Sequence, residues 1–432
     1  MASSSSSRGG LVVGVLCSLL AGVVSGGSVG PETVFNEAAY IPIDNSTAEL
    51  FYWVFESRHE PAKDPLILWL SGGPGCSSML ALFGENGPYQ MDGEEPKLNP
   101  HSWNRNATVV WIDQPRGTGF SRGVPVHSET QVADDMAAFL TSFFAKYPKY
   151  AALRLFIFGE SYAGHYVPAI SARVIDEFPR FQGAAIGNGL TDPAVQYQYY
   201  VPFAEQHDLV SKPVMGMMKT VEKLCEPLIK ACEKHQDDDD DRVETWAECL
   251  NAYLFCNLGE VTPVQSTGVN VYDVRTDCGD SPLCYDFSAV DAYLNRDDVQ
   301  QALGVKKTWQ ECSKLVDIVM VYGGGWVKTY SQDVKALLDR GKSVLIYAGE
   351  YDFICNWMGN QAWTKALDWA GKEAYNAAAN QSFVAPGAGG SFTSAANFTF
   401  LKLHDAGHLA PHDQPESTLA MVNRFTLPPA GW

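Results

Sequence analysis

Short apolar segments alternate with amphipathic ones along most of the chain, and this alternation limits the possible folds more than any other feature. The apolar segments are rich in β-branched and aromatic residues and lie at 48–57, 65–75, 106–115, 154–161, 342–352 and 398–408. Helical periodicity is found at 132–148 and 167–178. Buried strands interleaved with helices predict an α/β fold whose mostly parallel central sheet is covered by helices on both faces.

The alternation stops between the early and the late strands, in residues 192–325. This middle region contains most of the cysteines, several short helical patterns and the acidic run Asp237–Asp241. We expect it to be an insertion that caps the sheet, with the acidic run as a solvated loop. The expected organisation is a core formed by 29–191 and 326–432, an inserted cap region at 192–325, and a separate N-terminal segment at 1–28.

The N-terminal segment has the pattern of a secretory signal peptide. Arg8 precedes an apolar run from Leu11 to about Val24, and small residues follow it. A membrane anchor is the alternative, but the run is short for a bilayer. The sequence therefore predicts entry into the secretory pathway, with a vacuole, a lysosome or the extracellular space as the destination and no membrane association after the signal is removed.

Charge and composition narrow the range of partners. The formal net charge of −19 argues against nucleic acid as a partner, while the 46% of hydrophobic residues can supply a large core. No pattern predicts a cofactor or a metal, and a homodimer is left open.

An oxidising compartment changes how the cysteines and asparagines are interpreted. Cys17 leaves with the signal peptide, and the other nine of the ten cysteines make disulfides more plausible than a zinc cluster, since no CxxC pair occurs. Equal spacings of seven residues separate Cys225 from Cys232 and Cys249 from Cys256, which suits two nested bridges. Glycosylation sequons occur at Asn45, Asn106, Asn380 and Asn397.

A candidate nucleophile, Ser161, stands between a predicted strand and a predicted helix. Gly159, Ala163 and Gly164 are the small neighbours that such a sharp turn requires, although Ala163 replaces the last glycine of the strict G-x-S-x-G pattern. The preceding residue, Glu160, raises a difficulty, because a fixed negative charge would oppose an oxyanion formed at the serine. Ser161 can be catalytic only if Glu160 is uncharged when the reaction takes place.

Two further residues lie at strand ends in the order that suits a serine nucleophile. Asp352 closes one late strand and His408 follows the other, which gives serine, aspartate and histidine along the chain. The histidine would accept the serine proton, and the aspartate would orient the imidazole. A zinc site built from His404, His408 and His412 is the alternative, but Gly407 and Pro411 disfavour the helix that it needs.

Six blocks of sequence resemble the serine carboxypeptidases of the carboxypeptidase Y type. They are WLSGGPGCSS, IDQPRGTGFS, GESYAGHYVPA, GNGLTDP, YAGEYDFICNW and DAGHLAPHDQP, which occur in family order over nearly the whole chain. The resemblance implies an α/β-hydrolase fold with an inserted, disulfide-bonded cap. It also implies release of single residues from the C-termini of peptides and proteins at acidic pH, through an acyl-enzyme.

The resemblance also implies roles for individual residues. Its catalytic triad falls on Ser161, Asp352 and His408, and its oxyanion donors are the backbone N–H groups of Gly73 and Tyr162. The residues that would bind the substrate's terminal carboxylate are Trp69, Ser71, Gly72, Glu85 and Glu160. Those that would line the side-chain pocket are Leu190, Tyr197, Tyr200, Ile354, Cys355 and Leu409.

Four disulfides follow from the same resemblance, with Cys355 as the free thiol. They pair Cys76 with Cys312, Cys225 with Cys256, Cys232 with Cys249, and Cys278 with Cys284.

A shared proton resolves the difficulty with Glu160. Two carboxyls held close together do not both ionise, so a protonated Glu160 paired with Glu85 could donate a hydrogen bond to a terminal carboxylate. Ser71 departs from the family, in which asparagine is common and offers one more donor. Acyl transfer from ester donors is therefore an alternative activity. A different class of function is also an alternative: a hydrolase that has lost its activity and serves as a binding module.

Overall fold

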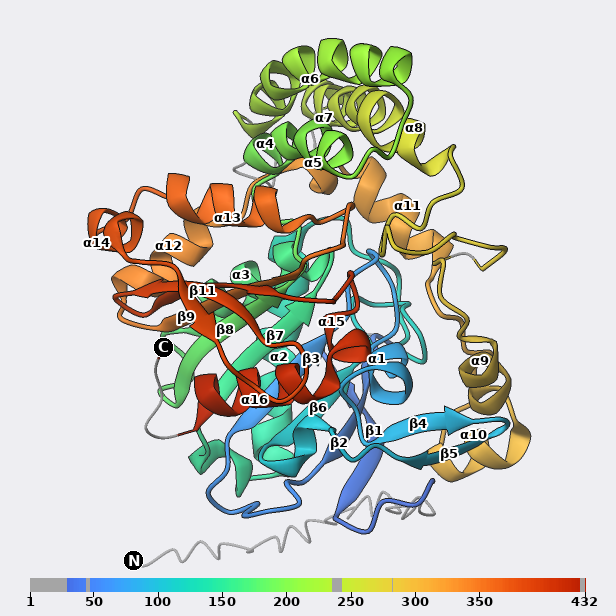
Figure 1. The fold of residues 1–432 in the computed structure, drawn as a ribbon. Coiled ribbons are helices and arrows are strands. Elements are labelled where there is room, and N and C mark those ends of the chain that lie inside the picture. The colour runs from blue at the N-terminus through green and yellow to red at the C-terminus, as the bar shows by residue number, and fades with distance from the viewer. Residues whose placement is uncertain (1–28, 44–46, 235–242, 282, 428–431) are drawn as a thin grey trace, which may run out of the picture.

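The computed structural model describes residues 29–43, 47–234, 243–281, 283–427 and 432. Within them a ten-stranded sheet runs through the molecule in the order β1-β2-β6-β3-β7-β8-β9-β12-β11-β10 (Figure 1). The six strands from β6 to β12 in this order are parallel to one another. The two strands at each edge, β1 and β2 on one side and β11 and β10 on the other, are added by antiparallel pairing. The strands are β1 (Asn36–Pro42), β2 (Glu49–Phe55), β3 (Leu66–Leu70), β6 (Thr108–Ile112), β7 (Leu155–Glu160), β8 (Phe181–Gly187), β9 (Ser343–Gly349), β10 (Gln381–Phe383), β11 (Gly390–Ala395) and β12 (Phe398–Leu403).

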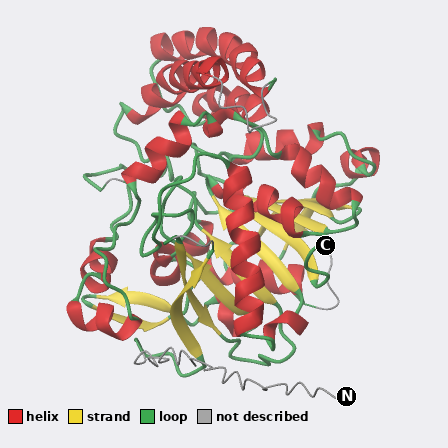
Figure 2. Cartoon of the chain, turned by 180° about the vertical axis from the view of Figure 1, so that it is seen from behind, coloured by secondary structure: helices red, strands yellow, loops and turns green. Residues whose placement is uncertain are grey.

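The central strands are apolar on both faces because both faces are covered. Along β3, Leu66, Leu68 and Leu70 belong to one hydrophobic cluster, whereas Ile67 and Trp69 belong to the other. This alternation between two buried sides is the pattern of a parallel sheet between two helical layers. Figure 2 shows the strands between helices in front of and behind the sheet.

The helices fall into two groups according to the cluster that they join. One face is covered by α2 (Glu129–Lys146), α3 (Ala163–Val174) and α12 (Ser331–Asp339), with α13 (Trp357–Ala366) and α14 (Lys372–Ala377) beside them. The other face is covered by α1 (Met79–Gly84), α9 (Ser288–Leu294), α10 (Asp297–Leu303), α15 (Ala410–Asp413) and α16 (Pro415–Thr426). A separate hairpin pairs β4 (Tyr89–Asp92) with β5 (Glu95–Leu98).

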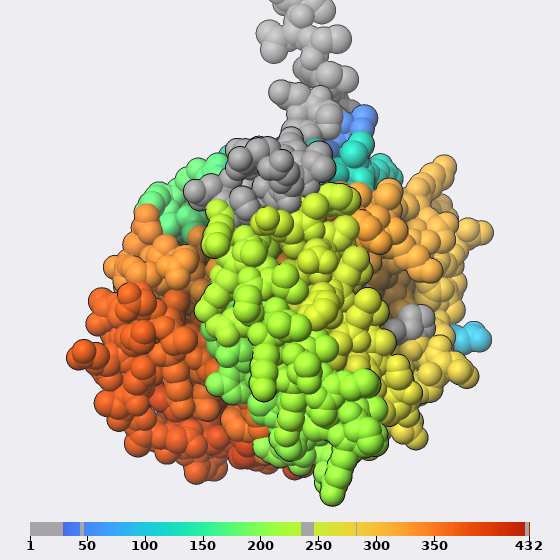
Figure 3. All heavy atoms as spheres, turned by 90° about the horizontal axis from the view of Figure 1, so that it is seen from above, coloured from blue at the N-terminus to red at the C-terminus, as the bar shows by residue number. Residues whose placement is uncertain are grey.

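A helical layer lies above the sheet at the top of Figure 1. Seen from above, it covers much of that side of the molecule (Figure 3). It consists of α4 (Pro193–Gln196), α5 (Tyr200–Gln206), α6 (Lys212–Glu233), α7 (Val243–Cys256) and α8 (Thr262–Gln265), and α11 (Lys314–Tyr322) lies next to it. The limits of 192 and 325 for a cap region stay a prediction.

The structure confirms the predicted fold class. Every strand expected from the sequence is present, and so are the two expected helices, as α2 and α3. None of the described helices combines the length and the apolar character needed to cross a membrane. The predicted signal peptide, the acidic run Asp237–Asp241 and the sequon at Asn45 lie outside the described residues.

Candidate active site

Ser161 occupies a strained turn between β7 and α3. Its φ of 66° is unusual for a residue with a side chain, and the turn is held by a hydrogen bond from its N–H to the Gly187 carbonyl oxygen (3.0 Å). Small residues are required around it. A Cβ added to Gly159 would lie 2.7 Å from the Ala163 Cβ, and one added to Gly164 would lie 2.4 Å from the Leu190 oxygen. The local sequence therefore specifies a partly exposed serine at the end of a central strand.

An imidazole and a carboxylate meet beside this turn. His408 Nδ1 lies 2.8 Å from Asp352 Oδ2, and both side chains are buried. The His408 N–H also donates to the Tyr272 carbonyl oxygen (2.7 Å), which fixes the loop after β12. With its Nδ1–H donated to Asp352, the ring leaves Nε2 as a proton acceptor. The structure brings together the three residues that the sequence singled out, although no hydrogen bond joins Ser161 to His408 within the described part of the chain.

Asn188, which the sequence analysis missed, orients the carboxylate. Its Nδ2 donates to Asp352 Oδ2 (2.8 Å), while its Oδ1 accepts from the Gly349 N–H (3.2 Å). The residue lies in the left-handed region (φ 42°) and follows β8 directly, in the GNGLTDP block. Asn188 therefore ties Asp352 to the ends of β8 and β9.

Replacing Asn188 by alanine should lower kcat/KM about 10- to 100-fold, because Asp352 would lose a donor that sets its orientation. Steady-state kinetics on a blocked dipeptide would measure the change. Asn356→Ala is the matched control, since Asn356 is equally buried but caps α13 through Gly359 (2.9 Å). Equal losses of kcat/KM in the two variants would mean that Asn188 has only a structural role.

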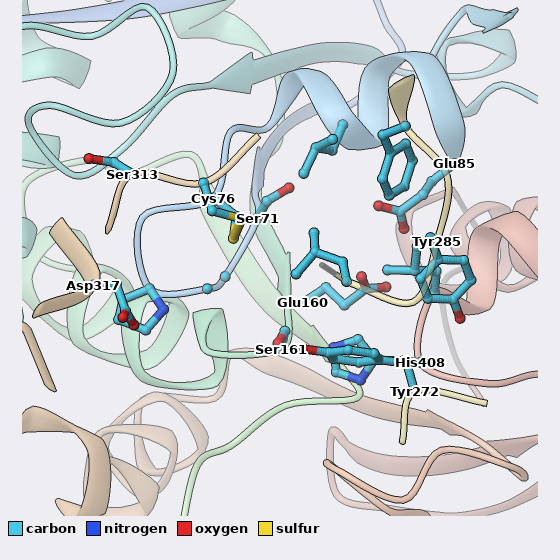
Figure 4. Close-up of a pocket in the computed structure, with 18 of the residues that line it drawn as sticks. Ser71, Cys76, Glu85, Glu160, Ser161, Tyr272, Tyr285, Ser313, Asp317 and His408 are labelled. Carbon is cyan, nitrogen blue, oxygen red and sulfur yellow. A yellow bond between two sulfur atoms is a disulfide. The ribbon is translucent and has the colours of Figure 1, made fainter. Parts of the chain in front are cut away.

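Ser161 and His408 line a cavity of about 250 Å³ that the carboxyl groups of Glu85 and Glu160 share (Figure 4). Asp317 lies on the opposite side of Ser161 from Glu85 in this view. The other lining residues come from the loop after β3, from α1, from the segment 272–287, from the start of α11 and the residues just before it, and from the loop after β12. They are Ser71, Gly72, Gly73, Pro74, Cys76, Leu80, Tyr272, Leu283, Tyr285, Phe287, Cys312, Ser313, Lys314 and Leu409.

Glu85 and Glu160 form a buried carboxyl pair. Each is only 4% exposed, and a hydrogen bond joins them. Burial raises the pKa of Glu85 to about 8, and burial together with the charges of Glu85 and Asp352 raises the pKa of Glu160 well above its ordinary value. At acidic pH the pair therefore holds its protons. The Oε2 atom of each carboxyl has no hydrogen-bond partner among the described residues, so each can bind a ligand.

Ser71 lines the cavity next to this pair, and Trp69 lies behind it. The indole N–H of Trp69 donates to Ser71 Oγ (3.2 Å), and the Ser71 N–H donates to Ser78 Oγ (3.1 Å). Because Ser71 Oγ accepts from the indole, its own proton is available to an acceptor in the cavity. Trp69 does not line the cavity and acts on it through Ser71.

Backbone N–H groups lie close to Ser161. A Cβ on Gly72 would lie 2.4 Å from the Tyr162 nitrogen and 2.8 Å from the Ser161 Cβ, so the glycine segment packs directly against the turn. Gly73 has a φ of 111°, a conformation that favours glycine, and a cis bond to Pro74. The Gly72–Gly73 segment and the Tyr162 N–H thus lie beside the serine.

One of the six residues predicted for the side-chain pocket lines the cavity around Ser161, and the pocket itself stays a prediction. Leu409 lines the cavity, but the five other residues belong to the hydrophobic cluster of the helical layer. They are Leu190, Tyr197, Tyr200, Ile354 and Cys355. Tyr200 donates to the Ile354 oxygen (2.8 Å), and its ring meets that of Tyr197 at 86°. These side chains pack against one another in the helical layer.

Three predicted disulfides are present: Cys76–Cys312, Cys232–Cys249 and Cys278–Cys284. The fourth, Cys225–Cys256, is not formed, and Cys355 is free as predicted. The ligand atoms of Cys225, Cys256 and Glu260 lie within 4.8 Å of one another. A hydrogen bond to Cys256 and burial raise the pKa of the Cys225 thiol, and burial raises that of Glu260 to about 10. The thiolate needed for oxidation is therefore disfavoured in this state.

The three histidines of the alternative zinc site have separate partners. His404 Nδ1 lies 3.1 Å from Glu350 Oε2, and His412 Nδ1 lies 2.8 Å from the Gly84 oxygen, whereas His408 pairs with Asp352. Their rings therefore have three different partners.

Of the described sequons, Asn380 and Asn397 are exposed and Asn106 is partly exposed, and their glycosylation stays a prediction.

Comparison with known proteins identifies the family. The serine carboxypeptidase family model matches residues 28–427. Carboxypeptidase Y from Candida albicans is 42% identical over 410 residues, covering 92% of this chain and 74% of the relative. Carboxypeptidase Y from Komagataella phaffii is 41% identical over 401 residues, covering 90% and 75%.

A solved structure supports the fold. A prohormone-processing carboxypeptidase from Saccharomyces cerevisiae superposes with a TM-score of 0.78 at 24% identity, covering 90% of both chains. The fold is therefore that of the α/β hydrolases with an inserted cap. The chain belongs to the serine carboxypeptidase family and is a serine-type carboxypeptidase.

Proposed function

We propose that the enzyme releases single amino acids from the C-terminus of peptides and proteins at acidic pH, through an acyl-enzyme on Ser161. The observation that carries the proposal is the buried Glu85–Glu160 pair in the cavity that holds Ser161 and His408. Glu160 directly precedes Ser161. A chain end bound to the pair therefore lies in the same cavity as the serine, which favours cleavage close to that end.

His408, oriented by Asp352, acts as the general base. Its Nε2 accepts the Ser161 proton as Oγ forms a bond to the scissile carbonyl carbon, and the N–H groups of Gly73 and Tyr162 stabilise the resulting oxyanion. The imidazolium then gives the proton to the leaving nitrogen, and the C–N bond breaks. A water molecule, deprotonated in the same way, hydrolyses the Ser161 ester and releases the shortened peptide.

The terminal carboxylate is bound by donors alone at acidic pH. Protonated Glu160 and Glu85 donate toward it, and Ser71 Oγ, set by Trp69, adds another donor beside the Gly72 backbone. No lysine or arginine is needed, because the protons on the carboxyl pair remove the repulsion. The negative charge that would oppose chemistry at Ser161 is then absent as well.

The KM for a blocked dipeptide with a free C-terminus should rise about tenfold or more between about pH 6 and about pH 9. Below its raised pKa of about 8, Glu85 is protonated and the pair donates; above it the pair ionises and repels the substrate carboxylate. Initial rates across this range would measure the effect. In Glu85→Gln, which keeps a donor but cannot ionise, the rise should flatten. A wild-type KM that stays constant through pH 9 would contradict the proposal.

Acyl transfer from an ester to a small alcohol is a second candidate, because Ser71 supplies one donor where asparagine would supply two. A blocked dipeptide and a glucose ester assayed side by side would separate the two activities. Faster turnover of the ester with transfer to an alcohol would favour the transferase.

We also propose that the enzyme acts in the lumen of a vacuole or lysosome, or outside the cell.

A further inference from the structure

We propose that Glu129 is a positioning residue for the reaction: through the phenol of Tyr162, it holds the main-chain N–H of Tyr162 at the oxyanion site. The proposal rests on the proposed function, in which this N–H stabilises the developing negative charge. Glu129 itself does not line the cavity around Ser161.

Glu129 is a buried carboxylate with two phenol donors. It is the first residue of α2 and is 1% exposed. Tyr162 Oη donates to its Oε1 (2.6 Å), and Tyr330 Oη donates to its Oε2 (2.7 Å). Both distances are short, and the start of a helix favours a negative group. The carboxylate therefore joins two side chains from distant segments to the N-terminus of α2.

The ring of Tyr162 is fixed on several sides. His165 stacks on it with centroids 4.5 Å apart and an interplanar angle of 14°, and Trp326 lies against it at 5.5 Å. Backbone closes the slot at the phenol. A Cβ on Gly325 would lie 2.8 Å from Tyr162 Oη and 3.2 Å from Glu129 Oε1. The side chain thus has one position in which its hydroxyl reaches the carboxylate.

This anchor bears on catalysis because Tyr162 follows the strained residue. Ser161 adopts a left-handed conformation, which persists only where the surroundings impose it. Tyr162 then enters α3 with φ −57° and ψ −17°. The proposed function requires its N–H to be directed at the cavity. The strand β7 fixes the turn from one side, and the Tyr162–Glu129 hydrogen bond fixes it from the other. Loosening that bond should let the N–H move away from the oxyanion.

A purely structural role for Glu129 makes a different prediction. If the carboxylate only satisfies two buried phenols, Tyr162 and Tyr330 are equivalent, because each donates one hydrogen bond of nearly equal length. If Glu129 positions the N–H, only the loss of the Tyr162 hydroxyl should affect the chemical step. Tyr330 therefore provides a matched control.

The test compares Tyr162→Phe with Tyr330→Phe in the full-length enzyme, using a blocked dipeptide at acidic pH. Tyr162→Phe should lower kcat about tenfold and change KM less than about twofold. It should weaken binding of a peptide aldehyde, which forms a tetrahedral adduct with the serine, by about the same factor as kcat. Tyr330→Phe should keep kcat and aldehyde affinity within about twofold of wild type. Its melting temperature should fall by about as much as that of Tyr162→Phe.

A double variant completes the test. Glu129→Gln should lower kcat as Tyr162→Phe does, and Glu129→Gln/Tyr162→Phe should lose no more than the worse single variant, since both remove one interaction. Equal kcat losses in the two tyrosine variants, or a change confined to KM, would overturn the proposal. If the proposed function itself were wrong, the wild-type enzyme would fail to cleave the dipeptide, which is a separate result.

Discussion

Replacing Ser161 by alanine should reduce kcat/KM for a blocked dipeptide by at least about 10⁴-fold. The hydroxyl is placed to form the acyl-enzyme, since it lies at the turn between β7 and α3 in a cavity that the imidazole of His408 also lines. Binding and the oxyanion donors would remain, so KM should change little. Rates would be measured at acidic pH, with the melting temperature as the test of folding.

A control variant makes the result specific. Ser313 lines the same cavity, and Ser313→Ala removes a hydroxyl there without touching the turn. We expect its kcat/KM to stay within about threefold of wild type. An organophosphate should label the wild type and Ser313→Ala but not Ser161→Ala. Residual activity of Ser161→Ala above about a tenth of wild type would exclude Ser161 as the nucleophile.

The sequence predicted the fold well where strands are apolar on both faces. Segments such as LILWL in β3 and TVVWI in β6 are continuous runs of strand-forming residues, and they became central strands. The strand β8 was missed because FQGAAIG is rich in glycine and alanine, which have low strand propensity. Its position depends on pairing with β7 and β9, where Gly183 has no room for a Cβ beside the Ser343 oxygen.

The candidate site was predictable where it follows strand ends. Ser161, Asp352 and His408 lie just beyond β7, β9 and β12, and parallel strands bring their carboxyl ends to one edge of the sheet. Asn188 follows the missed strand β8, so its contact with Asp352 was missed too. The GNGLTDP block, which contains Asn188, was the sequence feature that could have identified it, since the side chain of Asn188 contacts Asp352 and Gly349, outside that block.

Residues supplied by the insertion could not be placed from the sequence. Tyr272, Tyr285 and Asp317 line the cavity, but they come from loops and a helix whose position depends on long-range packing. The same reason applies to the predicted side-chain pocket. Whether Tyr197 and Tyr200 line such a pocket depends on how the helical layer packs, which leaves no periodic signal.

A matched peptide amide should be a far poorer substrate than the free acid. The Glu85–Glu160 pair and Ser71 offer donors, and an amide brings an NH₂ group that cannot accept from them. Buried polar groups left without partners are costly, and sites built around such bonds discriminate strongly. We expect kcat/KM to fall at least about 100-fold on amidation at about pH 5. In Glu160→Ala the ratio should shrink, because one of these donors is gone for both substrates.

The ratio of kcat/KM for free and amidated forms of one blocked dipeptide, at about pH 5, tests the account most directly. The account predicts at least about 100-fold in favour of the free acid. Equal turnover of the two peptides would contradict it.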